Sequence, residues 1–201
     1  GFAKEVYIRY NTNLSRTEFK GIKLFDLLPQ FQDWQICASI DGTDEVGEYI
    51  RDGLNYKQWL ENFKEGLAVA KTAREMRLDY TITLPGLLEL TNMFNLSVEL
   101  DAQILTKVMF TFSNDEILSP LALPKELMHT IIDEALEYIE PRATWKQQSI
   151  IDVLKNLKTR PNFVATKKGK QRQERIDKIR KQDITKILAK DERVLEWWTN
   201  I

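Results

Sequence analysis

Short strand-like patterns of hydrophobic and polar residues recur through the first half of the chain. Residues 5–10 and 78–84 place apolar side chains at every second position, which predicts strands with one buried face. Residues 35–40 are almost wholly apolar, as expected of a strand covered on both faces. Residues 107–112 predict a fourth strand.

Helical patterns separate these strands. Asn55 is a suitable N-cap for a helix to about residue 76, because apolar residues follow it at spacings of three and four. Residues 22–31 and 87–94 predict two shorter helices. Residues 97–100 are compatible with a short strand or an irregular connection, and the pattern leaves both open.

Strands that alternate with helices at intervals of 30–40 residues indicate an α/β protein with a parallel sheet. Helical patterns alone follow Pro124. They predict an all-helical C-terminal tail in residues 124–201, after an α/β domain in residues 1–123. The tail helices are expected at 125–139, 144–157, 171–188 and 192–198.

Four or five such strands form either a small open sheet or part of a (β/α) barrel. The chain starts on a strand with almost no lead-in, and Gly1 has the character of a residue left by a truncation. We therefore expect a partial barrel whose earlier strands lie upstream of this sequence. The edge of the first strand is then exposed, and we expect it to self-associate or to be buried under the tail.

The composition is that of an ordinary globular protein, with 43% hydrophobic and 29% charged residues. A formal net charge of −1 indicates no overall attraction to nucleic acid or to an anionic membrane. No apolar run approaches the roughly 20 residues that span a bilayer, and the N-terminus lacks a signal-peptide pattern. We expect a cytoplasmic protein without a membrane partner.

The chain has one cysteine, Cys37, and one histidine, His129. A single cysteine excludes an internal disulfide and any cluster or zinc site built from several thiolates of this chain. We expect Cys37 to be a buried thiol and His129 a packing or surface residue of a helix. The sequence also lacks a dinucleotide fingerprint, a phosphate-loop lysine and a nucleophile elbow.

Polar residues follow each predicted strand, where parallel α/β proteins bind their ligands. Solvated turns are polar as well, so each strand end is open to both interpretations. The strand-end residues are Asn11, Thr12 and Asn13, then Ser39 and Asp41, then Thr81 and Thr83, then Thr111, Ser113 and Asn114.

Two of these strand ends resemble a known family. The segment ICASIDGTDEVGEYIRDGL (36–54) is similar to the radical-SAM pattern in which a strand ends Ser-(Leu/Ile)-Asp-Gly and an arginine follows the next loop. YNTNLS (10–15) resembles the Thr-Asn-Gly type of strand end one unit earlier, with Asn-Leu in place of Asn-Gly. The order of motifs, with Trp59 in the next helix, resembles the twitch or SPASM-like subgroup.

This resemblance implies a binding site for S-adenosylmethionine. In the family the strand-end serine hydrogen-bonds the cofactor and the arginine pairs with its carboxylate, and these roles fall on Ser39 and Arg51. Asn11 and Asn13 would line the same pocket. Asp41 either faces the pocket or caps the turn with Gly42. The alternatives for Ser39 and Arg51 are a hydroxyl bonded to backbone and a surface ion pair with Glu48 or Asp52.

The resemblance also implies parts that this chain lacks. Radical-SAM enzymes hold a [4Fe–4S] cluster with a C-x-x-x-C-x-x-C loop after the first strand, and no such loop occurs here. We expect a fragment whose partner is the missing N-terminal half of the barrel, and which alone neither binds a cluster nor cleaves S-adenosylmethionine. The substrate of the parent enzyme is unknown; the resemblance favours a peptide or protein.

The rival interpretation is a non-catalytic α/β binding module that acts through its basic tail. Lysines and arginines gather between residues 160 and 181, and only Glu174 and Asp177 offset them. Such a run is compatible with a nucleic-acid contact, but a solvated helix face is the more common structure and the one we expect. Trp197 and Trp198 are expected to pack against a core or a partner.

Overall fold

Four parallel strands form the centre of the protein, whose structure, a computed structural model, describes residues 2–201. Each strand pairs with the next main strand along the chain, so the sheet has the order β1-β4-β5-β6. The strands are β1 (Tyr7–Thr12), β4 (Asp33–Ile40), β5 (Met76–Ile82) and β6 (Gln103–Val108). This arrangement confirms the α/β class and the parallel sheet expected from the sequence.

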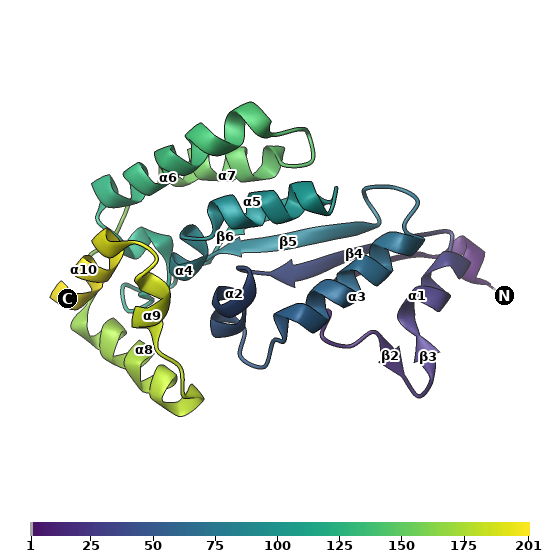
Figure 1. Ribbon diagram of the computed structural model, residues 1–201, viewed down its shortest axis with the longest axis horizontal. Coiled ribbons are helices and arrows are strands. Elements are labelled where there is room, and N and C mark those ends of the chain that lie inside the picture. The colour runs from purple at the N-terminus through teal and green to yellow at the C-terminus, as the bar shows by residue number, and fades with distance from the viewer. Residues whose placement is uncertain (1) are drawn as a thin grey trace.

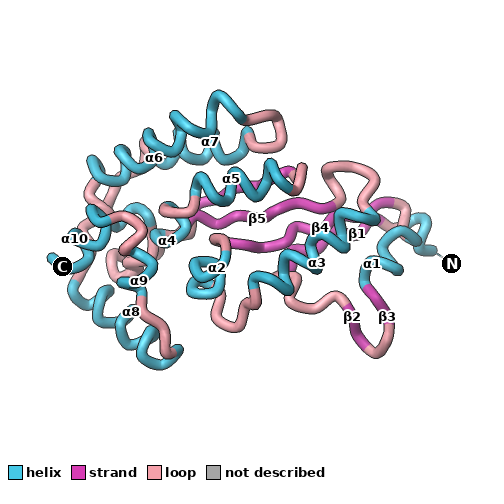
Figure 2. The backbone as a smooth tube through the Cα atoms, in the orientation of Figure 1, coloured by secondary structure: helices cyan, strands magenta, loops and turns pink. Residues whose placement is uncertain are grey.

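Helical connections join the strands, and Figure 1 shows two of the longer ones, α3 and α5, on the same side of the sheet. A two-stranded hairpin, β2 and β3, lies beside α1 near the N-terminus, as the tube in Figure 2 shows. The bounds are Phe2–Glu5 (a 3₁₀ turn), β2 Glu18–Phe19, β3 Ile22–Lys23, α1 Leu24–Leu27, α2 Asp44–Ile50, α3 Tyr56–Val69, α4 Leu84–Leu87 and α5 Leu90–Glu99.

The C-terminal helices occupy two places. Figure 1 shows α6 and α7 outside α5, and α8, α9 and α10 beyond the arrowheads of β4 and β5. Their bounds are α6 Lys125–Ile139, α7 Gln148–Leu157, α8 Lys167–Arg180, α9 Ile184–Leu188 and α10 Glu192–Asn200. Over residues 2–201, no helix has both the length and the apolar character needed to cross a bilayer.

The two faces of the sheet differ in chemistry. One face buries Ile36, Ala38 and Ile40 of β4 and the alternate residues of β5, which join a single hydrophobic cluster with the helices. Odd-numbered residues of β1, β4, β5 and β6 share the other face, because the register pairs odd positions with odd positions. That second face is polar and carries most of the residues discussed below.

The two edges of the sheet are also unlike. At the β6 edge, the N–H of Ile104 donates to the Lys146 carbonyl (3.0 Å) and that of Thr106 to the Ser149 hydroxyl (2.9 Å). At the β1 edge, the described residues provide no backbone partner on the side away from β4, and Tyr7 and Tyr10 are half-exposed. The first strand therefore lies at a free edge, as expected, and self-association through it stays a prediction.

Several element boundaries differ from those expected. The fourth strand covers Gln103–Val108 rather than 107–112, and residues 97–100 form the end of α5 and its C-cap rather than a short strand or an irregular connection. Asn55 does cap α3, accepting a hydrogen bond from the Gln58 N–H (2.9 Å), but α3 ends at Val69 because the chain must turn back to begin β5 at Met76. Residues 22–31 form a short hairpin strand followed by α1 and a 3₁₀ turn.

Alkaline pH is expected to destabilise the protein through its buried tyrosines. Burial, with smaller contributions from Asp44 and other carboxylates, raises the pKa of Tyr56 to about 12. Because an unfolded tyrosine has a pKa of about 10, the unfolded chain loses its proton first. The free energy of unfolding is therefore expected to fall as the pH rises from about 10 to about 12.

Urea unfolding at several pH values checks this expectation. The Tyr56→Phe variant should lose less stability across that interval than the wild type, whereas Tyr7→Phe, at a half-exposed position, should behave like the wild type. Equal pH profiles for the wild type and Tyr56→Phe would contradict the assignment.

Candidate functional site

A row of polar side chains crosses the sheet near the carboxyl ends of its strands. Ser39 of β4 pairs in register with Asp79 of β5, and its hydroxyl lies 3.4 Å from Asp79 Oδ2. Lys107 of β6 reaches the same carboxylate, with Nζ 2.7 Å from both oxygens. Side by side across the polar face, these three residues present a hydroxyl, a carboxylate and an ammonium group, and we call them the polar row.

Asp41 and Arg51 lie next to this row. Asp41 follows β4 and is buried; its Oδ1 accepts a hydrogen bond from the Thr81 N–H (3.1 Å). Arg51 Nε lies 2.8 Å from Asp41 Oδ2, although its N–H is not aimed at that oxygen, so the contact is an ion pair without an aligned hydrogen bond. The terminal nitrogens of Arg51 donate no hydrogen bond to any group in residues 2–201.

The loop and helix that follow β4 position Arg51. Thr43, the N-cap of α2, donates its backbone N–H (3.1 Å) and its hydroxyl (2.6 Å) to Oε2 of Glu89, which is fully buried. The helix then brings Arg51, its C-cap, back beside Asp41. A buried carboxylate from the segment before α5 thus anchors the turn that positions the guanidinium.

Asn11 and Asn13 lie on the edge strand and in the turn after it. Asn11 is exposed on the polar face and pairs in register with Cys37, one pair before Ser39 on that face. Asn13 uses its side-chain oxygen within the turn, accepting from the Ser15 N–H (3.3 Å) and the Ser15 hydroxyl (3.0 Å). Asn11 is therefore free to face a ligand, whereas the Asn13 carbonyl is already engaged.

Leu14 takes a backbone conformation that usually favours glycine. Its φ of 50° lies in the left-handed region, and its side chain is buried. The Leu14 carbonyl accepts a hydrogen bond from the Asn62 amide of α3 (2.8 Å), and the Thr12 hydroxyl accepts from its N–H (3.0 Å). Side-chain burial and these two hydrogen bonds hold a strained turn where the Thr-Asn-Gly pattern has glycine.

The remaining strand-end residues either cap a helix or lie in a loop away from the sheet. Thr83 caps α4 by accepting from the Gly86 N–H (3.0 Å). Thr111 donates its hydroxyl to Ser119 (2.7 Å), and Ser113 and Asn114 lie in the loop beyond β6. Because β6 ends at Val108, these three residues lie within a loop and not at the end of a strand, which corrects the expected strand end.

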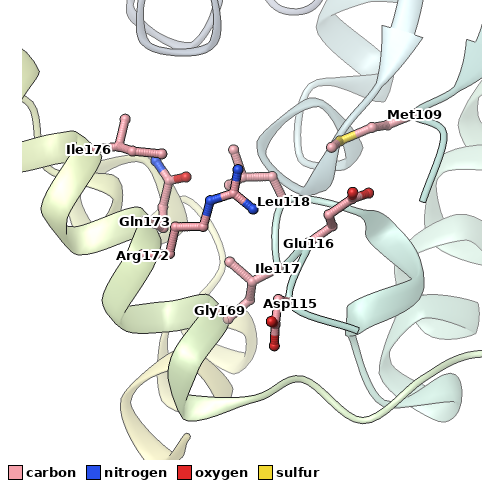
Figure 3. Close-up of a pocket in the computed structure, with 9 residues that line it drawn as sticks. All are labelled: Met109, Asp115, Glu116, Ile117, Leu118, Gly169, Arg172, Gln173 and Ile176. Atoms are coloured by element: carbon pink, nitrogen blue, oxygen red, sulfur yellow. The ribbon is translucent and has the colours of Figure 1, made fainter. Parts of the chain in front are cut away.

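A small cavity lies where the loop after β6 meets α8. Its volume is about 210 Å³, and Met109, Glu116 and Leu118 face Gln173 and Arg172 of α8 across it, as Figure 3 shows. Asp115 at its rim has a lowered pKa, first because of Lys168, which lies 2.7 Å away, and second because of the Thr166 hydroxyl. The contacts of Lys168 and Thr166 with Asp115 attach the start of α8, part of the basic tail, to the loop after β6.

A buried hydrogen-bond network joins α2 to α8. The Tyr49 hydroxyl (2.8 Å) and the Gln173 amide (2.8 Å) both donate to Asp177 Oδ1, and the Ile184 N–H donates to Oδ2 (2.8 Å). Burial, followed by the hydrogen bond to Asp177, raises the pKa of Tyr49 well above its usual value. The network joins α8 and the start of α9 to α2, which follows the carboxyl end of β4.

The isolated residues that sequence reasoning considered behave as packing groups. Cys37 is buried in β4, as expected, and His129 Nε2 lies 3.0 Å from the Lys158 carbonyl, between α6 and the end of α7. Trp198 is buried in the core. The described part of the chain contains no group of three or more histidine, cysteine, aspartate or glutamate residues arranged to hold a metal ion.

Sequence reasoning gave no role in the site to four charged residues, which are Asp79, Lys107, Glu89 and Asp177. The alternating pattern at 78–84 did place Asp79 opposite the apolar positions, which is the one signal that pointed to it. Comparison of the chain with protein-family models, with curated proteins and with solved structures finds no match.

Proposed function

We propose that this chain is the S-adenosylmethionine-facing part of a radical-SAM-type α/β barrel, and that the preceding half of the barrel holds the [4Fe–4S] cluster. The sequence motifs at residues 10–15 and 36–54 support the proposal. The consecutive strand order and the free edge of β1 are compatible with further strands before it. The residues of this chain do not fit a cluster, so its ligands are assigned elsewhere.

The observation that carries the proposal is the state of Arg51. Asp41 engages the Nε side of the guanidinium, at 2.8 Å, and leaves both terminal nitrogens without a hydrogen-bond partner. A forked pair of N–H donors fits a carboxylate in bidentate fashion. We assign Arg51 to the carboxylate of S-adenosylmethionine and Asp41 to holding the arginine in position.

Hydroxyl and amide groups nearby suit the rest of the cofactor. Ser39 lies on the polar face of β4, two residues before Asp41 in the turn that follows the strand, and Asn11 is exposed on the neighbouring strand. Donors and acceptors of this kind bind ribose hydroxyls and an amine. Asn13 takes part through its amide nitrogen, because its oxygen is bonded to Ser15.

The reaction class is the one that the resemblance implies. It is reductive cleavage of S-adenosylmethionine and hydrogen abstraction from a substrate, with a peptide or protein as the proposed class of substrate. This chain contributes cofactor binding, and a partner carrying the cluster supplies the electron.

Replacing Arg51 by glutamine is expected to weaken S-adenosylmethionine binding about 10- to 100-fold, because a hydrogen bond to a charged group contributes about 1.5–3 kcal/mol. Isothermal titration of the 201-residue chain with S-adenosylmethionine measures the effect. Arg51→Lys should recover only part of the loss, since a lysine lacks the forked donors.

Arg175→Gln is the matched control, because Arg175 is an exposed arginine on α8 without an ion pair in the described chain. Equal affinities for the wild type and Arg51→Gln would contradict the assignment of Arg51. If the wild type shows no saturable binding, either alone or after strands carrying the cysteine loop are added before residue 1, the rival interpretation as a non-catalytic binding module is favoured.

A further inference from the structure

A second groove lies at the opposite end of the strands from Ser39 and Arg51. Its volume is about 760 Å³, within the range of small-molecule sites. Residues at the amino ends of β1, β4 and β5 form it together with the loop before β5 and the loop before α7. The lining residues are Tyr7, Arg9, Asp33, Trp34, Gln35, Thr72, Ala73, Arg74, Arg77 and Trp145. We call it the arginine groove.

Three arginines line this groove without a carboxylate partner. Arg9, Arg74 and Arg77 form no ion pair with any acid in residues 2–201, whereas Arg51, Arg180 and Arg193 do. Arg77 Nε donates to the Arg74 carbonyl (3.0 Å), which fixes the Arg77 side chain at the groove wall. Asp33 is the acid in the lining, and its Oδ1 already accepts from the Trp34 N–H (2.8 Å).

The three positive charges are close enough to affect one another. Burial lowers the pKa of Arg77; the neighbouring charges of Arg74 and Arg9 lower it further, whereas Cys37 and Tyr7 act in the opposite direction. Like charges without counter-ions cost electrostatic free energy, which an anionic ligand removes. Guanidinium groups also match the oxygens of phosphate in forked pairs.

Two exposed aromatic rings flank the arginines. Tyr7 from the edge strand β1 is 52% exposed, and Trp145 from the loop before α7 is 61% exposed. Large aromatic side chains usually bury most of their surface, so two such rings in one polar groove are unusual. An exposed indole or phenol ring is a stacking surface for a planar aromatic group.

We propose that the arginine groove binds a nucleotide, with Arg9, Arg74 and Arg77 on its di- or triphosphate and the base stacked on Trp145 or Tyr7. The charge, the aromatic rings and the volume each fit this class of ligand. The site is separate from the one assigned to S-adenosylmethionine, because it lies at the amino ends of the strands. It does not depend on the proposed function.

Titration with three probes tests the proposal. ATP is expected to bind saturably and more tightly than pyrophosphate, and adenosine alone more weakly than either, because the arginines provide most of the binding. The Trp145 indole should report ATP binding as a fluorescence change that the Trp145→Phe variant reduces. Isothermal titration gives the affinities.

Variants separate the two parts of the site. Arg9→Gln, at an exposed position, should weaken the binding of ATP and of pyrophosphate at least fivefold. The double variant Arg9→Gln with Arg77→Gln should weaken both more than twentyfold. Trp145→Ala should weaken ATP but leave pyrophosphate unchanged. Arg175→Gln is the control and should change neither. Circular dichroism confirms that each variant is folded, and the exposed Arg9 variant keeps the test valid if the double variant is not.

Several outcomes would overturn the proposal. These are no saturable binding of ATP, equal binding by the wild type and the Arg9 variant, or adenosine binding as tight as that of ATP. A decaglutamate peptide that binds more tightly than ATP, with the same loss in the arginine variants, would instead assign the groove to an acidic segment of a protein partner.

Discussion

Replacing Asp177 by alanine is expected to lower the free energy of unfolding by about 3–5 kcal/mol. The Asp177 carboxylate is buried and accepts from the Tyr49 hydroxyl, the Gln173 amide and the Ile184 N–H, each at 2.8 Å. Alanine leaves all three donors without this acceptor. Each lost bond to a charged group costs about 1.5–3 kcal/mol, and relief of the buried charge offsets part of the sum.

The loss should be concentrated in the last three helices. Since Asp177 joins α8 to both α2 and the start of α9, hydrogen exchange in α8–α10 should become faster than in the strands. Urea unfolding followed by circular dichroism gives the free energy. Asp183→Ala is the control: Asp183 is an exposed N-cap of α9, and its removal should cost about 1 kcal/mol. A loss at Asp177 no larger than at Asp183 would show that the network does not hold the tail.

Replacing Gly47 by alanine is expected to destabilise the protein by about 2–3 kcal/mol. A Cβ at this position would overlap the Gly42 carbonyl oxygen and lie 3.2 Å from the carbonyl carbon. Both obstacles are backbone atoms of the turn after β4. That turn cannot move freely, because the buried Asp41 beside it is bonded to Thr81 and paired with Arg51.

The same change should also disturb the candidate site. Displacing α2 from the turn moves Arg51 relative to Ser39, so under the proposed function S-adenosylmethionine binding should weaken along with stability. Gly21→Ala is the control, because its Cβ would meet no atom within 4 Å. Its left-handed φ of 76° alone should cost about 1 kcal/mol, without an effect on binding. If Gly47→Ala and Gly21→Ala unfold at the same urea concentration, the backbone overlap is not the controlling feature.

Local patterns predicted some of the long elements well, although the helix expected at 171–188 is divided into α8 (Lys167–Arg180) and α9 (Ile184–Leu188). The helix expected at 125–139 has those bounds in the structure, because its apolar stripe faces the core along its whole length. The strand at 35–40 was found because its side chains are buried or half-buried on both faces. In both cases the periodicity of burial is already present in the sequence.

Local patterns failed where burial depends on distant residues. Phe110 and Phe112 alternate with polar residues as a strand would, yet both are exposed in the loop after β6. The strand begins instead at Gln103. There β6 pairs with β5 on one side, and on the other side the N–H groups of Ile104 and Thr106 donate to Lys146, before α7, and to Ser149, within it. The backbone hydrogen-bonding groups of the strand are satisfied in this way. Nothing in the sequence of residues 107–112 shows whether the apolar side chains of this alternating segment are buried in a strand or exposed in a loop.

The residues of the candidate site likewise fall into two groups, those that the sequence predicts and those that only the tertiary structure brings together. Ser39, Asp41 and Arg51 stand out in the sequence because they sit at fixed distances within one strand-turn-helix unit. Asp79 and Lys107 join them only through strand register, and the anchoring Glu89 comes from the next helical segment. Contacts between separate units leave no local pattern that a single sequence can reveal.

The sequence by itself determined the α/β class, the order of strands and helices, and the polar ends of β1, β4 and β5, because these follow from the spacing of side chains along the chain. Only the tertiary structure decided which charges meet, including the pairing of Arg51 with Asp41 and the gathering of Arg9, Arg74 and Arg77 in one groove. The physical reason is that hydrophobic periodicity is a local property, whereas electrostatic contacts depend on register and packing between segments far apart in the chain.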